Sequence, residues 1–232
     1  LVLGMGTGTY AKESKNFFPG NHITGVEIDQ KIVNLSRKYF DLSPQEADIF
    51  VNDGRTFLTS RDAKKYDLIM VDAYHDITIP FHMSTREFFA QVKEHLNPGG
   101  VLLMNINIRS GKANDIADYL TQTVKSEMKK VYRCPVQGST NTIVFASDDE
   151  KCLDSYKTNT GMITKDHPLA AIAGNVGGNL QEVTESKLVL TDEIAPVEIM
   201  GQKALDEIVS DSINYYKQMV NTSKNGIWDI LN

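Results

Sequence analysis

Short apolar runs alternate with longer stretches of helical period between Leu1 and about Ser147. The short runs are typical of buried strands, and the longer stretches carry their apolar residues on one face, as amphipathic helices do. This alternation predicts an α/β fold with a parallel sheet and helices on both of its faces. The expected strands are Leu1–Leu3, Ile23–Ile28, Asp48–Val51, Leu68–Val71 and Val101–Ile106, followed by an antiparallel pair at Val131–Pro135 and Thr142–Ala146. The expected helices are Ala11–Phe18, Gln30–Tyr39, Gly54–Leu58, Thr85–Leu96 and Lys112–Lys130.

The regular pattern weakens after Ser147, where we expect a C-terminal extension. Thr158–Gly178 is rich in Gly, Asn and Thr, which predicts a long loop rather than a core element. Ala204–Val220 recovers a helical pattern with its apolar residues mostly on one face, which predicts a helix packed on the surface. These features divide the chain into a sheet domain at residues 1–147 and an extension at residues 148–232, in which a loop and a helix pack on that domain.

Composition and charge exclude several classes of protein. Of the 232 residues, 41% are hydrophobic and 23% are charged, as in an ordinary globular protein rather than a disordered one. The formal net charge of -6 provides no field that attracts phosphate backbones, so nucleic acid is not an expected partner. Cys134 and Cys152 are too few for a disulfide framework, and the His and Cys residues show no metal-ligand spacing. We therefore expect a reducing, cytoplasmic location and no metal.

A glycine-rich turn at Gly4–Gly8 directly follows the first expected strand and precedes the first expected helix. The backbone of such a turn can approach a ligand closely, and the N–H groups of the helix start point toward it. A dinucleotide fingerprint requires its third glycine at position 9, where Thr9 stands, so the tighter spacing favours a nucleoside ligand without a pyrophosphate. A purely structural tight turn explains the glycines equally well.

Acidic residues follow three of the expected strands, at the edge where open α/β sheets bind ligands. Glu27 ends the second strand, roughly 20 residues beyond the glycines, where a carboxylate can accept both hydroxyls of a ribose. Asp29 is better explained as the N-cap of the next helix. Asp53, after the third strand, can accept the exocyclic amine of an adenine, cap the following helix, or do both. The fourth strand is followed by a polar cluster of Asp72, Tyr74, His75 and Asp76.

The glycine turn, Glu27, Asp53, Asp72 and the turn at Asn97–Gly100 follow one another on successive strands. This order resembles the class I S-adenosylmethionine-dependent methyltransferase fold, which is Rossmann-like. More narrowly, the sequence resembles the spermidine synthase family, and most of all the bacterial spermidine synthase-like domains that are often fused to a membrane transporter-like region. The segments that carry this resemblance are Tyr66–Tyr74, Ile79–Phe89 and Leu190–Glu198.

The resemblance implies that residues 1–147 bind S-adenosylmethionine or its decarboxylated form as a cosubstrate. The residues implied in this binding are Gly4, Gly6, Thr7, Gly8, Glu27, Asp53, Gly54 and Asp72. Within this set Glu27 would bind the ribose, and Asp53 with Gly54 would bind the adenine. The implied activity is the transfer of an aminopropyl group to a small-molecule amine. The residues implied in catalysis are Asp72 and Asp76, which would bind the amine, His75 or Asp76, which would accept its proton, and Tyr74, which would line the pocket.

The sequence departs from the spermidine synthase family at two acidic positions. Thr7 stands where the family has an Asp that holds the ammonium of the aminopropyl group, and His75 stands where the family has a catalytic Asp. The family's N-terminal β-hairpin region, which contributes to the amine site and to oligomerisation, is absent from this chain. Two alternatives therefore stay open. One is an S-adenosylmethionine-dependent methyltransferase, which needs only an in-line path from its cosubstrate to a methyl acceptor, and the other is a non-catalytic nucleoside-binding domain.

The first residues of the chain indicate whether the natural protein continues upstream of them. Leu1 lies in an expected buried strand, so we expect the natural protein to continue upstream. No apolar run approaches the roughly 20 residues that span a bilayer. An upstream membrane region in the full-length protein, with this chain as its cytoplasmic domain, and a homodimer are both compatible with the resemblance.

Overall fold

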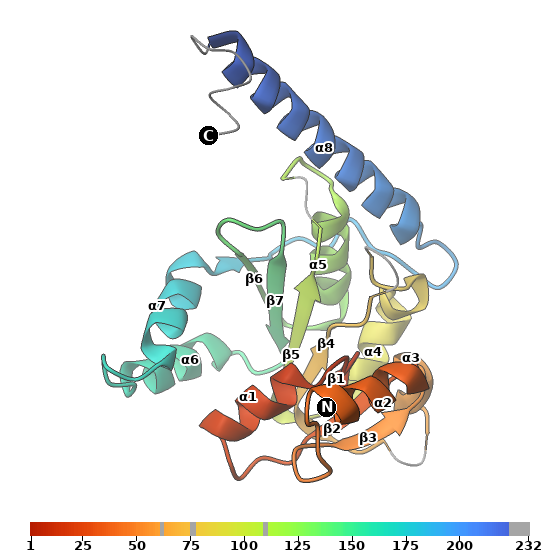
Figure 1. Cartoon of the computed structure of the whole chain (residues 1–232), viewed down its shortest axis with the longest axis vertical. Helices are drawn as coiled ribbons and strands as arrows, with labels where there is room; N and C mark the ends of the chain where they lie inside the picture. Colours follow the sequence, from red (N-terminus) through yellow and green to blue (C-terminus); the bar gives the residue numbers. More distant parts are fainter. Residues whose placement is uncertain (61–62, 75–77, 109–110, 223–232) are drawn as a thin grey trace.

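The computed structural model describes residues 1–60, 63–74, 78–108 and 111–222 (Figure 1). Within these residues, eight strands form one sheet in the order β3-β2-β1-β4-β5-β7-β6-β8. The strands are β1 Val2–Leu3, β2 Thr24–Glu27, β3 Asp48–Val51, β4 Tyr66–Val71, β5 Leu96–Ile106, β6 Lys130–Pro135, β7 Thr142–Ser147 and β8 Gln181–Glu182. The helices are α1 Thr9–Phe17, α2 Gln30–Tyr39, α3 Gly54–Leu58, the 3₁₀ helix η1 Phe81–Met83, α4 Arg86–Glu94, α5 Ile116–Glu127, α6 Cys152–Gly161, α7 Leu169–Asn179 and α8 Val197–Thr222.

The sheet combines parallel and antiparallel pairing. Strands β3, β2, β1, β4 and β5 pair in parallel, and β7, β6 and β8 continue the sheet with antiparallel pairs. This confirms the predicted α/β fold, with its parallel sheet and antiparallel strand pair. The short strand β8 was not predicted, and it extends the antiparallel side of the sheet beyond β6.

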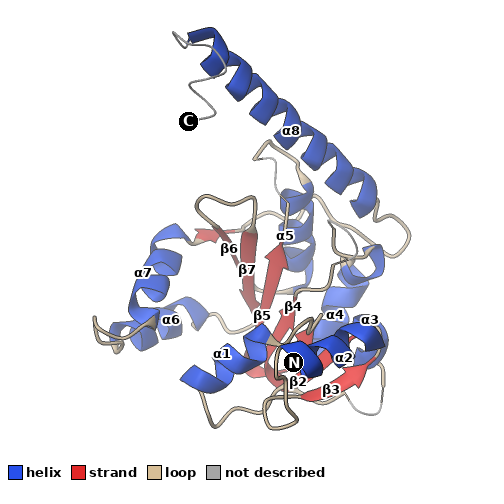
Figure 2. Ribbon diagram, viewed as in Figure 1, coloured by secondary structure: helices blue, strands red, loops and turns tan. Residues whose placement is uncertain are grey.

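Helices cover both faces of the sheet (Figure 2). Neighbouring residues of β1 show this, because successive side chains of a strand point to opposite faces. Val2 belongs to a small apolar cluster with Ala11 of α1, whereas Leu3 belongs to the large core cluster with Phe88 of α4 and Leu120 of α5. All of these side chains are buried. The carboxyl end of β1, and the glycine turn that follows it, are therefore held between two packed layers.

The prediction of a long loop at residues 158–178 is wrong. Helix α6 extends to Gly161 and α7 occupies residues 169–179, so two helices fill most of this region. Glycine is a poor helix former, and its abundance in α7 hid the helix from the sequence pattern. Tertiary contacts with α6 stabilise α7 instead. The Tyr156 hydroxyl donates to the Ala173 carbonyl at 2.6 Å, and Gly177 lies against the Tyr156 ring, where an added Cβ would be 3.3 Å from Cε1.

Helix α8 begins at Val197, earlier than the pattern predicts, and its first turns pack on the rest of the molecule. Val197, Gly201 and Ala204 are buried. Gly201 meets Thr78 so closely that an added Cβ would lie 2.0 Å from Cγ2 of the threonine. Beyond these turns the helix projects away from the sheet and its covering helices (Figure 1). Although α8 is long, none of the helices in the described part of the chain is apolar enough to cross a membrane.

Candidate active site

A cleft with a volume of about 790 Å³ opens at the carboxyl ends of strands β1 to β4. The predicted site residues in its wall are Gly4, Gly6, Glu27, Asp53, Gly54, Asp72 and Tyr74. Thr7 and Gly8 are not part of the wall, and His75 and Asp76 lie outside the described residues. The fold thus brings most of the predicted residues, from four different strand ends, around one cavity.

Glu27 at the end of β2 ties the glycine turn to the sheet. Its side chain is buried, and both carboxylate oxygens accept hydrogen bonds from backbone N–H groups. Oε2 accepts from Gly6 at 2.9 Å, and Oε1 accepts from Asp29 at 3.1 Å. Each oxygen keeps a second lone pair. The carboxylate can therefore hold the turn and still accept hydrogen bonds from a diol in the cleft.

The glycines of the turn meet different requirements. Gly4 has a φ of +90°, and an added Cβ would lie 2.5 Å from the backbone carbonyl oxygen that follows β4, so glycine is needed for this close approach. Gly8, with a φ of 83°, caps α1 and lies against the Leu42 side chain. The Thr7 hydroxyl is 3.2 Å from the Thr9 hydroxyl. Gly4 therefore allows the backbone of the turn to pass close to the end of β4 in the cleft wall, whereas Gly8 allows the start of α1 to pack against Leu42.

Asp53 makes two contacts at the start of α3. Its Oδ1 accepts a hydrogen bond from the Thr56 backbone N–H at 2.8 Å, which confirms the predicted capping role. Its Oδ2 lies 2.8 Å from Nε2 of His82, a cleft residue that sequence spacing did not indicate. Burial acts to raise the pKa of Asp53, but the hydrogen bonds from Thr56 and His82 outweigh it and hold the pKa below its usual value. Asp53 is therefore a charged acceptor in the cleft wall at neutral pH.

Asp72 and Tyr74 are joined through Asn105 of β5. The side-chain amide of Asn105 donates to Oδ1 of Asp72 at 3.0 Å, and the Tyr74 hydroxyl donates to the Asn105 backbone carbonyl. Burial, together with the nearby Asp72 carboxylate, raises the pKa of Tyr74. The phenol therefore stays protonated at neutral pH and acts as a hydrogen-bond donor rather than as a base.

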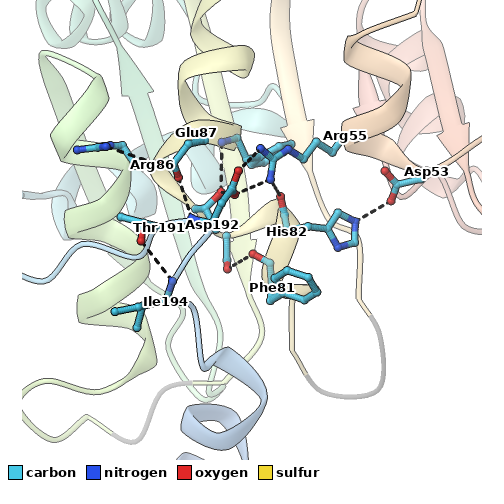
Figure 3. A network of polar contacts seen from close by, with 12 residues as sticks. Asp53, Arg55, Phe81, His82, Arg86, Glu87, Thr191, Asp192 and Ile194 are labelled. Atoms are coloured by element: carbon cyan, nitrogen blue, oxygen red, sulfur yellow. Dashed lines mark hydrogen bonds and ion pairs between the residues drawn. The ribbon is translucent and has the colours of Figure 1, made fainter.

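Residues 190–196, which we call the closing segment, fasten the C-terminal part of the chain to one side of the site (Figure 3). Arg55 of α3 forms a bidentate ion pair with Asp192, with both N···O distances at 2.7 Å, and also donates to the His82 carbonyl at 3.0 Å. The hydroxyl of Thr85, the N-cap of α4, donates to the same carboxylate at 2.7 Å. The hydrogen bonds from Arg55 hold the pKa of Asp192 below its usual value. The closing segment is thus fixed to both α3 and α4.

Helix α8 contributes a further wall of the cleft through Glu198, Gln202 and Leu205. None of these three residues was predicted to belong to the site, because they come from a distant part of the chain. Glu198 adds a fourth carboxylate to those of Glu27, Asp53 and Asp72, and the described part of the wall contains no Lys or Arg. Such a lining favours a ligand that carries positive charge. Within the described residues, no three His, Cys, Asp or Glu side chains are grouped closely enough to hold a metal ion.

The fold and its cleft place the protein in the methyltransferase-like class of α/β proteins. The sequence model of the spermine/spermidine synthase domain matches residues 1–166, which is more than half of the chain. The chain belongs to the spermine/spermidine synthase family. This confirms the resemblance inferred from the sequence.

Individual relatives show how far the similarity extends. A probable polyamine aminopropyl transferase of Bifidobacterium longum is 40% identical over 237 residues, which cover 95% of this chain and 52% of the relative. Putrescine N-methyltransferase 2 of Nicotiana tabacum is 32% identical over 107 residues, which cover 44% of this chain and 30% of the relative. The crystal structure of a probable spermidine synthase from Corynebacterium glutamicum has a TM-score of 0.60 at 24% identity, covering 81% of this chain and 66% of that chain, and supports the fold. The chain therefore spans about half the length of the Bifidobacterium relative.

Proposed function

We propose that the protein transfers an aminopropyl group from decarboxylated S-adenosylmethionine to a small-molecule amine. The observation that carries this proposal is the 40% identity with the probable polyamine aminopropyl transferase, which extends over 95% of this chain. The acidic wall of the cleft supports it, because the donor ends in an ammonium group and the acceptor carries amines.

We assign the nucleoside to the side of the cleft next to the glycine turn. Glu27 accepts hydrogen bonds from the ribose hydroxyls through the lone pairs that the two backbone N–H groups leave free. Asp53 accepts a hydrogen bond from the exocyclic amine of adenine, which lies beside Gly54. The cleft volume of about 790 Å³ falls within the range of roughly 300–1,000 Å³ that is usual for small-molecule sites.

In the proposed reaction, the nitrogen lone pair of the amine attacks the aminopropyl carbon next to the sulfonium. A C–N bond forms and the C–S bond breaks with its electron pair on sulfur, so the leaving group is the neutral thioether methylthioadenosine. The attacking amine must be neutral, and the product loses one proton. We assign Asp72, oriented by Asn105, to hold the amine in line, and the protonated Tyr74 to position this end of the cleft. The predicted proton acceptors, His75 and Asp76, lie outside the described residues.

Methyl transfer is the second candidate. The similarity to a putrescine N-methyltransferase favours it. The departure at Thr7 favours it as well, because the Asp that the spermidine synthase family has at this position would repel the carboxylate of intact S-adenosylmethionine. Thr7 does not line the cleft itself, and it leaves this end of the glycine turn without a charge.

The thioether product distinguishes the two reactions. The protein is incubated with putrescine and either decarboxylated or intact S-adenosylmethionine, and the products are identified by mass spectrometry. Aminopropyl transfer yields methylthioadenosine, whereas methyl transfer yields S-adenosylhomocysteine. Asp72→Asn should lower turnover, and Asp154→Asn, the same change at an exposed residue of α6, should not.

Two outcomes would overturn the proposal. Production of S-adenosylhomocysteine alone would identify a methyltransferase. Binding of methylthioadenosine in calorimetry, without product under either condition, would identify a non-catalytic nucleoside-binding domain.

A further inference from the structure

The projecting part of α8 separates its apolar residues from its polar ones. From Leu205 to Asn221, the apolar residues and tyrosines occupy an arc of roughly 160° at 3.6 residues per turn. We call this arc the α8 stripe. It comprises Leu205, Ile208, Val209, Ile213, Tyr215, Tyr216, Met219 and Val220, with Ser212 as its polar member. The other residues of this span are all polar, so the helix has one face suited to packing and one suited to water.

The α8 stripe is largely exposed although it is apolar. The exposed fraction is 37% for Leu205, 47% for Val209 and for Ile213, 59% for Tyr215 and 53% for Tyr216. Figure 1 shows this half of the helix extending beyond the rest of the molecule. Helical stability in proteins comes mainly from the packing of an apolar face, because isolated helices are marginal in water. An exposed, continuous apolar stripe therefore indicates a docking surface.

We propose that the α8 stripe pairs with the same stripe of a second copy of this chain, as two antiparallel helices. The charges beside the stripe support this arrangement. Asp206 and Lys217 are both exposed and both lie on the flank next to Ile213. In an antiparallel helix pair, residues on the same flank of the seam face each other across the interface. Each Asp206 can therefore face the partner's Lys217.

The positions of these residues along the helix fit one two-fold axis. The midpoint of Asp206 and Lys217 lies between residues 211 and 212, and the midpoint of the stripe from Leu205 to Val220 lies between residues 212 and 213, one residue further along. A single axis near residue 212 aligns the two apolar stripes to within one residue and forms two equivalent ion pairs, as a closed two-fold dimer requires. A parallel pair lacks this match, because it sets Asp206 level with the partner's Asp206 and about 16 Å from the partner's Lys217.

The charge of the helix argues against a membrane surface as the occupant. Amphipathic helices that lie on membranes typically carry basic residues on their polar face. The polar side of residues 205–221 instead carries Asp206, Glu207 and Asp211 against the single Lys217. A surface of this charge would be repelled by anionic lipid headgroups. A second copy of the chain fits better, since its acidic and basic positions complement each other.

The dimer would also reach the cleft. Leu205 belongs both to the α8 stripe and to the cleft wall. In the antiparallel register, the partner's helix end near Met219 lies next to Leu205, which lines the cleft. A contact made by one helix from each copy falls below the roughly 800 Å² per partner of a standard interface. We therefore expect a weak dimer that forms in the micromolar concentration range.

Sedimentation velocity of residues 1–232, from micromolar to several hundred micromolar, tests the dimer. Val209→Asp puts a charge in the stripe and should raise the dimer Kd by at least about tenfold. Ile199→Asp is the matched control, because it makes the same kind of change at a residue that is 72% exposed on the same helix but precedes the stripe. It should leave the Kd unchanged, and circular dichroism checks that both variants remain folded.

Exchange of charges tests the antiparallel register. Asp206→Lys and Lys217→Asp should each raise the Kd about three- to tenfold, because each replaces an ion pair with a like-charge contact, and the double substitution should restore it. A chain that stays monomeric at every concentration would overturn the proposal. A dimer that Val209→Asp and Ile199→Asp affect equally would also overturn it, and so would binding to anionic vesicles that Val209→Asp abolishes in a monomeric chain.

Discussion

Replacement of Glu27 with glutamine tests how one buried carboxylate serves both the fold and the proposed ligand. Glu27→Gln keeps the length of the side chain but exchanges one acceptor oxygen for an NH₂ group. Because the two oxygens accept from the N–H groups of Gly6 and Asp29, the NH₂ group must face one of these donors. A hydrogen bond to a charged group contributes about 1.5–3 kcal/mol, and we expect the free energy of unfolding to fall by about this amount.

The same substitution weakens the proposed ribose contact. The ribose hydroxyls then face a neutral amide in place of a charged carboxylate. The loss of a hydrogen bond to a charged acceptor should weaken methylthioadenosine binding by about 1.5–3 kcal/mol, which corresponds to a Kd roughly 10 to 150 times higher. The two effects are separable because one appears without ligand and the other only with it.

Urea denaturation measures the free energy of unfolding, and titration calorimetry with methylthioadenosine measures the Kd under conditions in which every variant is folded. Asp29→Asn is the matched control, since it removes a nearby carboxylate but keeps a side-chain oxygen that can cap α2. We expect this control to change both quantities little. A folded Glu27→Gln variant with an unchanged Kd would refute the ribose contact and leave Glu27 with its structural role alone.

Three further substitutions test other contacts. Asp192→Asn should lower the free energy of unfolding by about 1 kcal/mol at neutral pH. Pairing with Arg55 lowers the pKa of the Asp192 carboxyl. In urea denaturation at several pH values, the difference in unfolding free energy between Asp192→Asn and the unsubstituted protein should therefore be full above the unfolded pKa of about 3.9 and should disappear as the pH falls through the lower folded pKa. A difference that persists in acid would contradict this expectation. Gly201→Ala should lower the free energy of unfolding by about 1–3 kcal/mol, because the added Cβ meets the buried Thr78. Gly174→Ala in α7, where the added Cβ meets open space, should raise it by about 0.5–1 kcal/mol. Equal melting temperatures of the two variants would contradict both expectations. Thr7→Asp should shift relative affinity in calorimetry toward the decarboxylated cosubstrate on the order of tenfold, and an equal shift with Thr9→Asp would show that position 7 makes no specific contact.

The parts of the site that follow from the sequence are those fixed by local order along the chain. In a parallel sheet reached through crossover helices, the strands end at the same edge. Glu27 and Asp72 each come directly after an apolar run, so their common location was predictable. Helix caps are local as well. Asp29 accepts a hydrogen bond from the Lys31 N–H at 2.7 Å, as its position directly before a helical pattern predicts.

Contacts between distant segments leave no such pattern. His82 is 29 residues from Asp53, and Asp192 is 137 residues from Arg55. Neither separation corresponds to a turn, a helix face or a strand pair, so only the assembled fold brings these side chains together. The same reason explains the missed helix α7, since its stability depends on contacts with Tyr156 that intrinsic propensity does not include.

The closing segment and α8 make the C-terminal extension a working part of the proposed site. A chain that ends at residue 147 would leave Arg55 without its carboxylate partner and would remove Glu198 from the cleft wall. It would also remove Val197, which is fully buried in the core, and Gly201, which packs against Thr78. We therefore expect this chain to unfold at a lower urea concentration than residues 1–232 and to bind methylthioadenosine at least about tenfold more weakly.

A chain that ends at residue 208 is the matched control for this truncation. It keeps the closing segment and the part of α8 that lines the cleft, and it lacks the projecting half of that helix together with residues 223–232. We expect it to bind methylthioadenosine as residues 1–232 do in dilute solution, where the proposed dimer is dissociated. Equal binding by the chain ending at residue 147 would show that the nucleoside site is complete within the sheet domain, and that Glu198 and the closing segment take no part in it.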